Sequence, residues 1–360
     1  MQSLLSDKKD QSKMSIYDLK MFPTAIVAAF GALLLLFFYI SSSPARQSVP
    51  DGMVSMNELL SIAIQAAENG GDKVKAIAEG KDIGQASKGQ TAEGVDDPIT
   101  LGDQYSHEAI VGTIRKAYGD SVFIYSEEKD SHHLDLDNIK EPSYSLSSKA
   151  SAAINHADEL VNKEDVTIWV DPLDATKEYT EKLLNYVTTM VCVAVKGKPV
   201  IGVIHKPFRD DNLRTVWAWD GKGANIVDKS GEHSGNEGIV IVSRSHKGDV
   251  DGVIEKYVPG GHAIGAGGAG YKVEELFGYP SDNDEKTTPI AYVHTTLIKK
   301  WDICAGNALL NHFGGKMTKL SGEDINYDKS LDPKNTGGLV AAVHNHEKVL
   351  SWFSEYAHSD

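Results

Sequence analysis

Cysteine is scarce in this chain of 360 residues, which contains only Cys192 and Cys304. Two cysteines exclude a small domain held together by several disulfides and a zinc site built from two Cys-x-x-Cys pairs. Basic residues are also in deficit, because 36 Lys and Arg stand against 51 Asp and Glu, for a formal net charge of −15. That balance argues against broad binding to duplex nucleic acid, so we predict no nucleic-acid partner. We expect both cysteines to be free, buried packing residues.

Long apolar runs are absent with one exception, the uncharged segment 21–40 (MFPTAIVAAFGALLLLFFYI). Its length matches the thickness of a bilayer. Four lysines precede it and only Arg46 follows closely, so we predict a cytosolic tail over 1–20, a single transmembrane anchor over 21–40 and a stalk over 41–54, with the rest of the chain lumenal. A cleaved signal peptide is the alternative, although its apolar region is usually shorter. No Asn-x-Ser/Thr acceptor is present to support a lumenal location independently.

The remaining segment, 55–360, has the composition of a folded enzyme domain. Ser55 and Glu58 form a capping-box pattern that predicts a helix ending at Gly70-Gly71. A second helix is predicted over 103–119, and the apolar run VTIWV at 166–170 predicts a buried strand. Residues 186–207 are predicted to form a hairpin that turns at Gly197-Lys198. The mixture of hairpins and interleaved helices indicates an α+β or layered α/β domain, not a purely parallel doubly wound sheet.

The strongest chemical signal is the motif Asp171-Pro172-Leu173-Asp174-Ala175-Thr176, which directly follows the buried strand. Two carboxylates and a backbone carbonyl at the end of a strand offer the oxygen ligands that Mg²⁺ prefers. An Asp-rich turn, in which Asp174 caps the next helix, is the structural alternative, and the motif alone does not decide between them.

Other acidic residues become informative in combination. Glu127 and Glu128 end a second predicted strand, Asp302 begins a predicted helix, and Asp103 lies near the start of another. Alone, Glu127-Glu128 is typical of a solvated pair, and Asp103 and Asp302 are typical of helix caps. Together, such carboxylates can converge only if a cation offsets their repulsion, which indicates a divalent metal site.

The ordered series of Asp103, Glu127-Glu128, DPLDAT at 171–176 and WDICAG at 301–306 resembles the lithium-sensitive, Mg²⁺-dependent phosphatase superfamily that includes the inositol monophosphatases. The resemblance covers nearly all of the chain from residue 55 onward. It implies an alternating αβαβα sandwich of the inositol monophosphatase/fructose-bisphosphatase type. The stretches VSRSH (242–246) and GGAGYKV (267–273) resemble the Golgi-resident members that act on adenosine 3′,5′-bisphosphate.

The resemblance also implies roles for the acidic residues. Glu127, Asp171 and the Leu173 carbonyl would hold one Mg²⁺, and Asp171, Asp174 and Asp302 a second. A third ion would bind more weakly near Glu127, and Li⁺ would inhibit by replacing one of the less tightly held ions.

Asp103 would pair with the Thr176 hydroxyl to activate the attacking water, although Thr176 also suits a helix N-cap. Many relatives carry Gly where this chain has Ala175, and we expect Ala175 to have a negative φ because of its methyl group.

The substrate-binding end is expected around a glycine string at 265–270. By resemblance, Ser243, His246, Gly268 and Lys272 contact the adenosine 5′-phosphate portion of the ligand. On local context alone, His246 is typical of a structural histidine and Lys272 of a solvated helix lysine. The string also matches Gly-x-Gly-x-x-Gly, but no opening βαβ unit surrounds it, so we reject a dinucleotide site.

The segment 21–40 predicts a membrane anchor, and the resemblance implies a Golgi-lumenal phosphatase that converts adenosine 3′,5′-bisphosphate to AMP and phosphate and so supports sulfation. One alternative keeps the chemistry but acts on an inositol phosphate. Another is a catalytically silent, membrane-tethered nucleotide-binding protein, which the complete acidic set disfavours.

Overall fold

A computed structural model describes residues 49–80, 82–91, 94–130, 135–232, 238–245, 249–279 and 288–357. The predicted tail, the predicted anchor over 21–40, the stalk up to residue 48 and His246 lie outside these ranges. No helix within the described ranges combines the length and the apolar character needed to cross a bilayer. The folded unit begins at Val49, and the following paragraphs concern that unit alone.

The first sheet has six strands in the order β10-β9-β8-β7-β6-β4. β4 and β6 are parallel, and the remaining neighbours are antiparallel. The strands are β4 (Phe123–Ser126), β6 (Val166–Asp174), β7 (Thr188–Val195), β8 (Lys198–His205), β9 (Thr215–Trp219) and β10 (Gly223–Ala224). The predicted hairpin is confirmed as β7–β8. Its turn lies one residue earlier than predicted, at Lys196-Gly197, where both residues have the positive φ of a tight two-residue turn.

The second sheet has five strands in the order β12-β11-β13-β17-β15. β11 is parallel to β12 and β13, whereas β17 is antiparallel to β13 and β15. The strands are β11 (Ile239–Ser243), β12 (His262–Ala266), β13 (Ala291–His294), β15 (Lys316–Thr318) and β17 (Leu339–Ala342). Three two-stranded pairs complete the described strands: β1 (Met53–Ser55) with β5 (Leu160–Asn162), β2 (Ala86–Gln90) with β3 (Asp96–Ile99), and β14 (Ile298–Lys299) with β16 (Lys334–Asn335).

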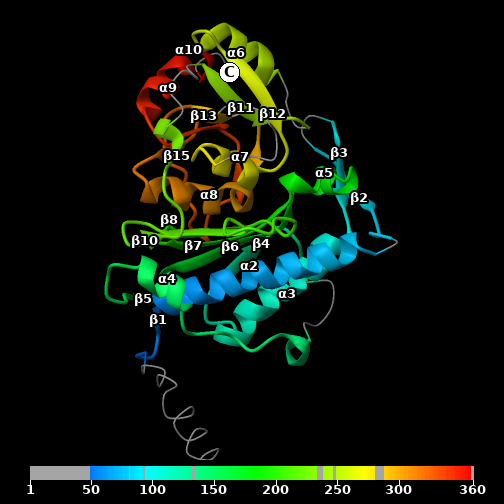
Figure 1. Cartoon of the computed structure of the whole chain (residues 1–360), viewed down its shortest axis with the longest axis vertical. Coiled ribbons are helices and arrows are strands. Elements are labelled where there is room, and N and C mark those ends of the chain that lie inside the picture. The colour runs from blue at the N-terminus through cyan, green and yellow to red at the C-terminus, as the bar shows by residue number, and fades with distance from the viewer. Residues whose placement is uncertain are drawn as a thin grey trace, which may run out of the picture. The chain divides into compact units, whose positions relative to one another are not determined.

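Helices cover both faces of each sheet. They are α2 (Met56–Ala78), α3 (Leu101–Tyr118), α4 (Ser148–Ala153), α5 (Thr176–Thr180), α6 (Val250–Tyr257), α7 (Ala269–Glu275), α8 (Lys300–His312), α9 (His346–Trp352) and α10 (Ser354–Ala357). Figure 1 shows α2 and α3 on one face of the first sheet, α7 and α8 between the sheets, and α6, α9 and α10 beyond the second sheet. The predicted αβαβα layering is therefore present.

Alternation along β7 explains how one strand serves two cores. Val191 and Val193 pack with the residues of α2 and α3, whereas Met190, Cys192 and Ala194 pack with the residues of α7 and α8. Successive side chains of a strand point to opposite faces, so a strand covered on both sides reads as one continuous apolar run.

Helix α2 departs from the sequence prediction at its glycines. Ser55 caps it as expected, because its hydroxyl accepts a hydrogen bond from the Glu58 amide at 3.0 Å. The helix does not end at Gly70-Gly71 but continues to Ala78. A Cβ on Gly70 would lie 2.6 Å from the Ile110 side chain, and one on Gly71 would overlap the His205 ring. These glycines allow close packing against α3 and β8, and that gain overrides their low helix propensity.

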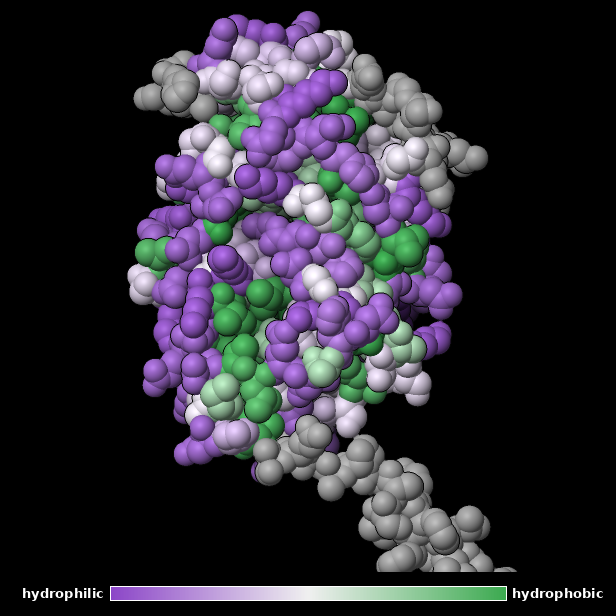
Figure 2. All heavy atoms as spheres, turned by 90° about the vertical axis from the view of Figure 1, so that its left-hand side faces the viewer, coloured by the Kyte–Doolittle hydropathy of each residue, from purple (hydrophilic) through white to green (hydrophobic). Residues whose placement is uncertain are grey.

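One face is mostly hydrophilic, with apolar side chains gathered in a strip in its lower half (Figure 2), on the side where β1, β5 and α4 lie in Figure 1. The exposed large apolar side chains among the described residues include Leu160 in β5 and Phe123 in β4.

Candidate active site

The candidate site begins at the carboxyl end of β6, where all nine residues of the strand are buried. Asp171 is 1% exposed, and one of its carboxylate oxygens accepts a hydrogen bond from the Leu173 amide at 3.1 Å. The pairing register between β6 and β7 shifts between Asp171 and Asp174. Pro172 lies within this bulge and has no amide hydrogen for the ladder, which suits it to an irregular position.

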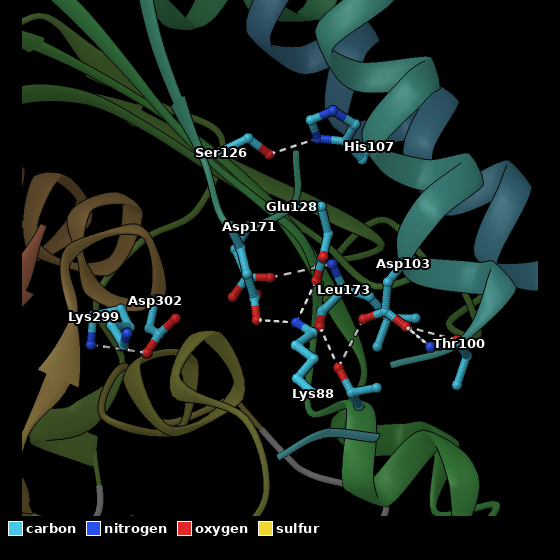
Figure 3. Close-up of polar contacts among 12 residues, drawn as sticks. Lys88, Thr100, Asp103, His107, Ser126, Glu128, Asp171, Leu173, Lys299 and Asp302 are labelled. Carbon is cyan, nitrogen blue, oxygen red and sulfur yellow. Dashed lines mark hydrogen bonds and ion pairs between the residues drawn. The ribbon is translucent and has the colours of Figure 1, made fainter. Parts of the chain in front are cut away.

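Glu127 reaches the same place because β4 runs parallel to β6. Its amide donates to the Val170 carbonyl at 3.1 Å, so Glu127, directly after β4, lies beside the segment of β6 that carries Asp171. Asp302 arrives from the first turn of α8, where its carboxylate accepts a hydrogen bond from the Lys299 amide at 3.2 Å. One carboxylate oxygen from each of Glu127, Asp171 and Asp302 lies within 4.8 Å of the others. Figure 3 shows Asp171 and Asp302 facing this space from β6 and α8.

Asp174 lies beside this cluster but is turned toward α7. Its two carboxylate oxygens accept hydrogen bonds from the amides of Ala269 (3.1 Å) and Gly270 (2.8 Å) and from the Thr188 hydroxyl (3.1 Å). Asp174 therefore joins the strand that carries Asp171 to the first turn of α7. Its role as a metal ligand remains a prediction.

Asp103 and Thr176 are brought together by α3 and α5. The Thr176 hydroxyl lies 2.9 Å from a carboxylate oxygen of Asp103 and 3.0 Å from the Leu173 carbonyl oxygen. The other Asp103 oxygen accepts hydrogen bonds from the amide and hydroxyl of Thr100, both at 2.7 Å. Asp103 thus belongs to a helix cap and also contacts Thr176, so the two interpretations of this residue are compatible. Helix α5 begins at Thr176 itself, with Ala175 rather than Thr176 in the N-cap position.

The expectation of a negative φ at Ala175 is wrong. Its φ is 69° and its ψ is 42°, the left-handed conformation that favours glycine. A methyl group in this region costs roughly 1–2 kcal/mol, which the surrounding structure must offset. The residue lies at the reversal between β6 and α5, where the buried aspartates on one side and the helix on the other fix the path of the backbone.

Ser243 and Gly268 lie around one turn at the predicted substrate-binding end. Ser243 ends β11 opposite Ala266 in the parallel strand β12, and the chain then turns through Gly268 into α7. Gly268 has a φ of 63°, and a Cβ there would lie 2.9 Å from an Asp174 oxygen. The turn therefore approaches the aspartates closely only because it lacks a side chain.

Lys272 differs from one of its two sequence interpretations, and its contact with the 5′-phosphate of the ligand stays a prediction. It is 3% exposed, so it is not a solvated lysine. Its ammonium group donates to the Gly268 carbonyl and lies 5.1 Å from the centre of the Tyr292 ring. Burial lowers its pKa, with the charge of Asp174 acting in the opposite direction. The ammonium group therefore stabilises the glycine turn through its hydrogen bond to the Gly268 carbonyl.

Lys88 is a residue of the site that sequence reasoning missed. It lies in β2, and its ammonium group forms ion pairs with Glu127 (2.7 Å) and Glu128. Figure 3 shows it extending among the acidic side chains. No local signal distinguishes Lys88 from the neighbouring lysines, because its importance comes from the hairpin that carries it.

The cysteines also differ from expectation, because Cys192 and Cys304 form a disulfide. They are separated by 112 residues in sequence, so no local spacing could have indicated the bond.

Residues 55–358 match the family model described as "Inositol monophosphatase family". The chain belongs to the inositol monophosphatase family. It is 44% identical over 294 residues to "Inositol monophosphatase 3" of Xenopus laevis, covering 81% of this chain and 80% of that protein. It is 43% identical over 315 residues to the "Golgi-resident adenosine 3′,5′-bisphosphate 3′-phosphatase" of Rattus norvegicus, covering 85% and 83%. The crystal structure of CysQ from Bacteroides thetaiotaomicron shares the fold, with a TM-score of 0.53, 21% identity, and coverage of 81% and 99%.

Membership makes the chain a phosphatase of a Mg²⁺-dependent, lithium-sensitive family, and the electrostatics of the site fit such an ion. Burial raises the pKa of Asp171, and the charges of Glu127, Asp174 and Asp302 raise it further. Burial likewise raises the pKa of Glu127 to about 7, although Lys88 opposes the shift. Carboxylates that repel one another in a buried space gain most from a divalent cation. The Lys88 ammonium already supplies one positive charge there, which supports the same conclusion.

Proposed function

We propose that this chain removes the 3′-phosphate from adenosine 3′,5′-bisphosphate, giving AMP and phosphate. The observation that carries the proposal is the convergence of Glu127, Asp171 and Asp302 within 4.8 Å, beside a glycine turn that contacts Asp174. With divalent cations bound between them, the carboxylates would suit the phosphoryl group that is attacked, and we place the rest of the nucleotide along the turn. The name of the rat relative supports the choice of substrate.

The acidic residues would hold Mg²⁺ between them. Glu127, Asp171 and the Leu173 carbonyl would form one part of the site, and Asp171, Asp174 and Asp302 the other. Bound Mg²⁺ supplies Lewis acidity to the phosphoryl oxygens and lowers the pKa of water. Two or three ions are expected, with lithium as an inhibitor.

Asp103 and Thr176 would orient the attacking water. When the Thr176 hydroxyl donates a hydrogen bond to the Asp103 carboxylate, the lone pairs of the hydroxyl oxygen stay free to accept a hydrogen bond from water. Burial raises the pKa of Asp103 to about 6, with the Thr100 hydrogen bonds opposing the shift, so Asp103 is ionised and able to accept that proton at neutral pH. The pair therefore fixes a direction of attack.

We further propose that the chain is a single-pass type II protein of the Golgi membrane, with its catalytic domain in the lumen, where it would support sulfation. Three features support this location: the uncharged segment 21–40, the relatives named as Golgi-resident, and the disulfide. Disulfides persist in the oxidising compartments of the secretory route and are rare in the cytosol.

An inositol phosphate is the second candidate substrate, because relatives at a similar identity are named inositol monophosphatase 3. The test is release of phosphate by the full-length chain in detergent, with and without Mg²⁺ and Li⁺. The proposal requires Mg²⁺-dependent release from adenosine 3′,5′-bisphosphate at a higher kcat/KM than from inositol monophosphate. The reverse order would favour the second candidate, and no release from either compound would favour a silent binding protein.

A further inference from the structure

The disulfide connects the two parts of the molecule that supply the clustered carboxylates. Cys192 lies in β7, directly opposite Trp169 of β6, and Trp169 is two residues before Asp171. Cys304 lies in α8, two residues after Asp302. The Cα atoms of the two cysteines are 5.7 Å apart, and both residues are almost completely buried. The bond therefore links the sheet and the helix within a short distance of the acidic side chains.

Helix α8 also touches the sheet at this point through its backbone. Gly202 of β8 is the other neighbour of Cys192, and a Cβ on Gly202 would overlap the Ala305 carbonyl oxygen. Ala305 follows Cys304 directly, so the helix backbone lies against the sheet beside the disulfide. A small separation of helix and sheet here would move Asp302 away from Asp171.

The charges of the site favour such a separation. Glu127 and Asp171 belong to the sheet, whereas Asp302 belongs to α8, and their oxygens lie within 4.8 Å of one another. Like charges at this separation repel one another. This repulsion is greatest before a cation binds. A covalent link that resists it would reduce the reorganisation needed on binding, and preorganisation of this kind increases affinity.

We propose that the Cys192–Cys304 disulfide is a positioning crosslink that holds Asp302 within reach of Asp171 and Glu127 and so increases the affinity of the site for divalent cations. The inference rests on the proposed metal-binding role of these carboxylates, but it does not depend on which phosphate ester is hydrolysed. Neither sulfur contacts a reacting atom, and the effect acts through the position of α8.

The test measures Mn²⁺ binding to the full-length chain in detergent, by calorimetry and by the electron paramagnetic resonance of free Mn²⁺. The variants are Cys192→Ala/Cys304→Ala and the milder Cys304→Ser, which also removes the crosslink. The matched control is Leu310→Ala, which removes a buried side chain from α8 and leaves the disulfide intact. We expect both cysteine variants to bind Mn²⁺ about tenfold more weakly. We expect the control to lose stability in urea while retaining the wild-type Mn²⁺ affinity.

Reduction provides a third arm without mutation. Dithiothreitol transfers two electrons and two protons, the S–S bond breaks, two thiols form, and the reagent becomes a cyclic disulfide. Mn²⁺ affinity should fall as the thiol count rises to two. For the active enzyme, the Mg²⁺ concentration at half-maximal rate should rise while kcat at saturating Mg²⁺ stays near wild type.

Three results would overturn the proposal: unchanged Mn²⁺ affinity after loss of the crosslink, equal weakening in Leu310→Ala, or free thiols in the untreated protein. A wild-type chain that binds no Mn²⁺ would defeat the proposed metal site and this inference together. Weaker Mn²⁺ binding in the cysteine variants of a chain that hydrolyses no nucleotide would support the crosslink and contradict the proposed substrate.

Discussion

Side chains form the proposed metal-binding end of the candidate site, whereas backbone forms most of its proposed substrate-binding end. Glu127, Asp171 and Asp302 are fixed by β4, β6 and α8, elements that pack into large apolar cores. At the other end, a glycine turn approaches Asp174 through amide groups, and the nearby Lys272 is buried beneath it. The comparison suggests that the first end determines the reaction and the second determines which molecule is admitted.

The largest expected effect is at the proposed metal-binding end, where one substitution should lower activity and raise stability. Asp171→Asn should reduce phosphate release by about 10³-fold or more, because several kcal/mol of transition-state stabilisation depend on the held cation. The same change removes one of the repelling charges, so the metal-free variant should unfold at a higher temperature than the wild type. Phosphate assays and calorimetry without metal would measure the two effects.

Asp165→Asn is the matched control for this prediction, because Asp165 precedes the opposite end of β6 and pairs with Lys196 at the surface. It should leave both quantities near the wild-type values. If the Asp171→Asn variant were active, or less stable than the wild type without metal, the cluster would not be a cation site whose carboxylates repel one another.

A substitution at the substrate-binding end should have a smaller effect and indicate what Lys272 does. In Lys272→Met, loss of the hydrogen bond to the Gly268 carbonyl should loosen the turn and reduce kcat/KM by about 10–100-fold, the range for residues that act through a neighbour. If Lys272 only supports the turn, adenosine 3′,5′-bisphosphate and adenosine 3′-monophosphate should be affected equally. A loss confined to the bisphosphate would instead show direct contact with the 5′-phosphate, as the sequence predicted.

The pH dependence of stability should expose the unfavourable charge of Glu127. Because its pKa is raised to about 7 in the folded state, the folded protein binds more protons than the unfolded chain between about pH 4.5 and 7. Its contribution to the free energy of unfolding therefore falls as the pH rises through that window. Metal-free Glu127→Gln should be more stable than the wild type at pH 8, and the difference should shrink toward pH 5.

Comparison of these two proteins cancels the opposite effect of His205. Burial lowers the pKa of that ring to about 4, so it destabilises both proteins equally as the pH falls below about 6.5. Thermal melts of both proteins across pH 5–8 measure the difference. A difference that grows as the pH falls would be the opposite of what burial of Glu127 predicts.

Local sequence patterns predicted the metal-binding end better than the substrate-binding end. Asp171 was recognisable because it follows a continuous apolar strand, and Glu127 because it ends a second one. Their proximity required only that two parallel strands end at one edge of a sheet. The αβαβα layering was predicted from the family resemblance. The pattern of hairpins and helices in the sequence agreed with it.

The features that the sequence did not predict depend on contacts between distant segments. Gly70 and Gly71 are typical of a helix end, but packing against Ile110 and His205 keeps them helical. Ala175 adopts a positive φ because the elements on both sides constrain it. The disulfide partners are 112 residues apart. Local propensity carries no information on such contacts. The conformation or bonding of these residues was therefore predicted from their neighbours in sequence, whereas their neighbours in space determine it.

The smallest predicted effect is that of substituting Lys88. It tests whether this lysine competes with a bound cation. Its ammonium group occupies the acidic space from the β2–β3 hairpin, so a divalent cation must compete with it for Glu127. Lys88→Ala should therefore lower the Mn²⁺ dissociation constant about threefold, in the range expected for a partly exposed ion pair. Lys88→Arg, which keeps the charge, should remain near the wild type. Weaker Mn²⁺ binding in the alanine variant would mean that Lys88 assists the bound state, and the hairpin would then belong to the working site rather than compete with its cation.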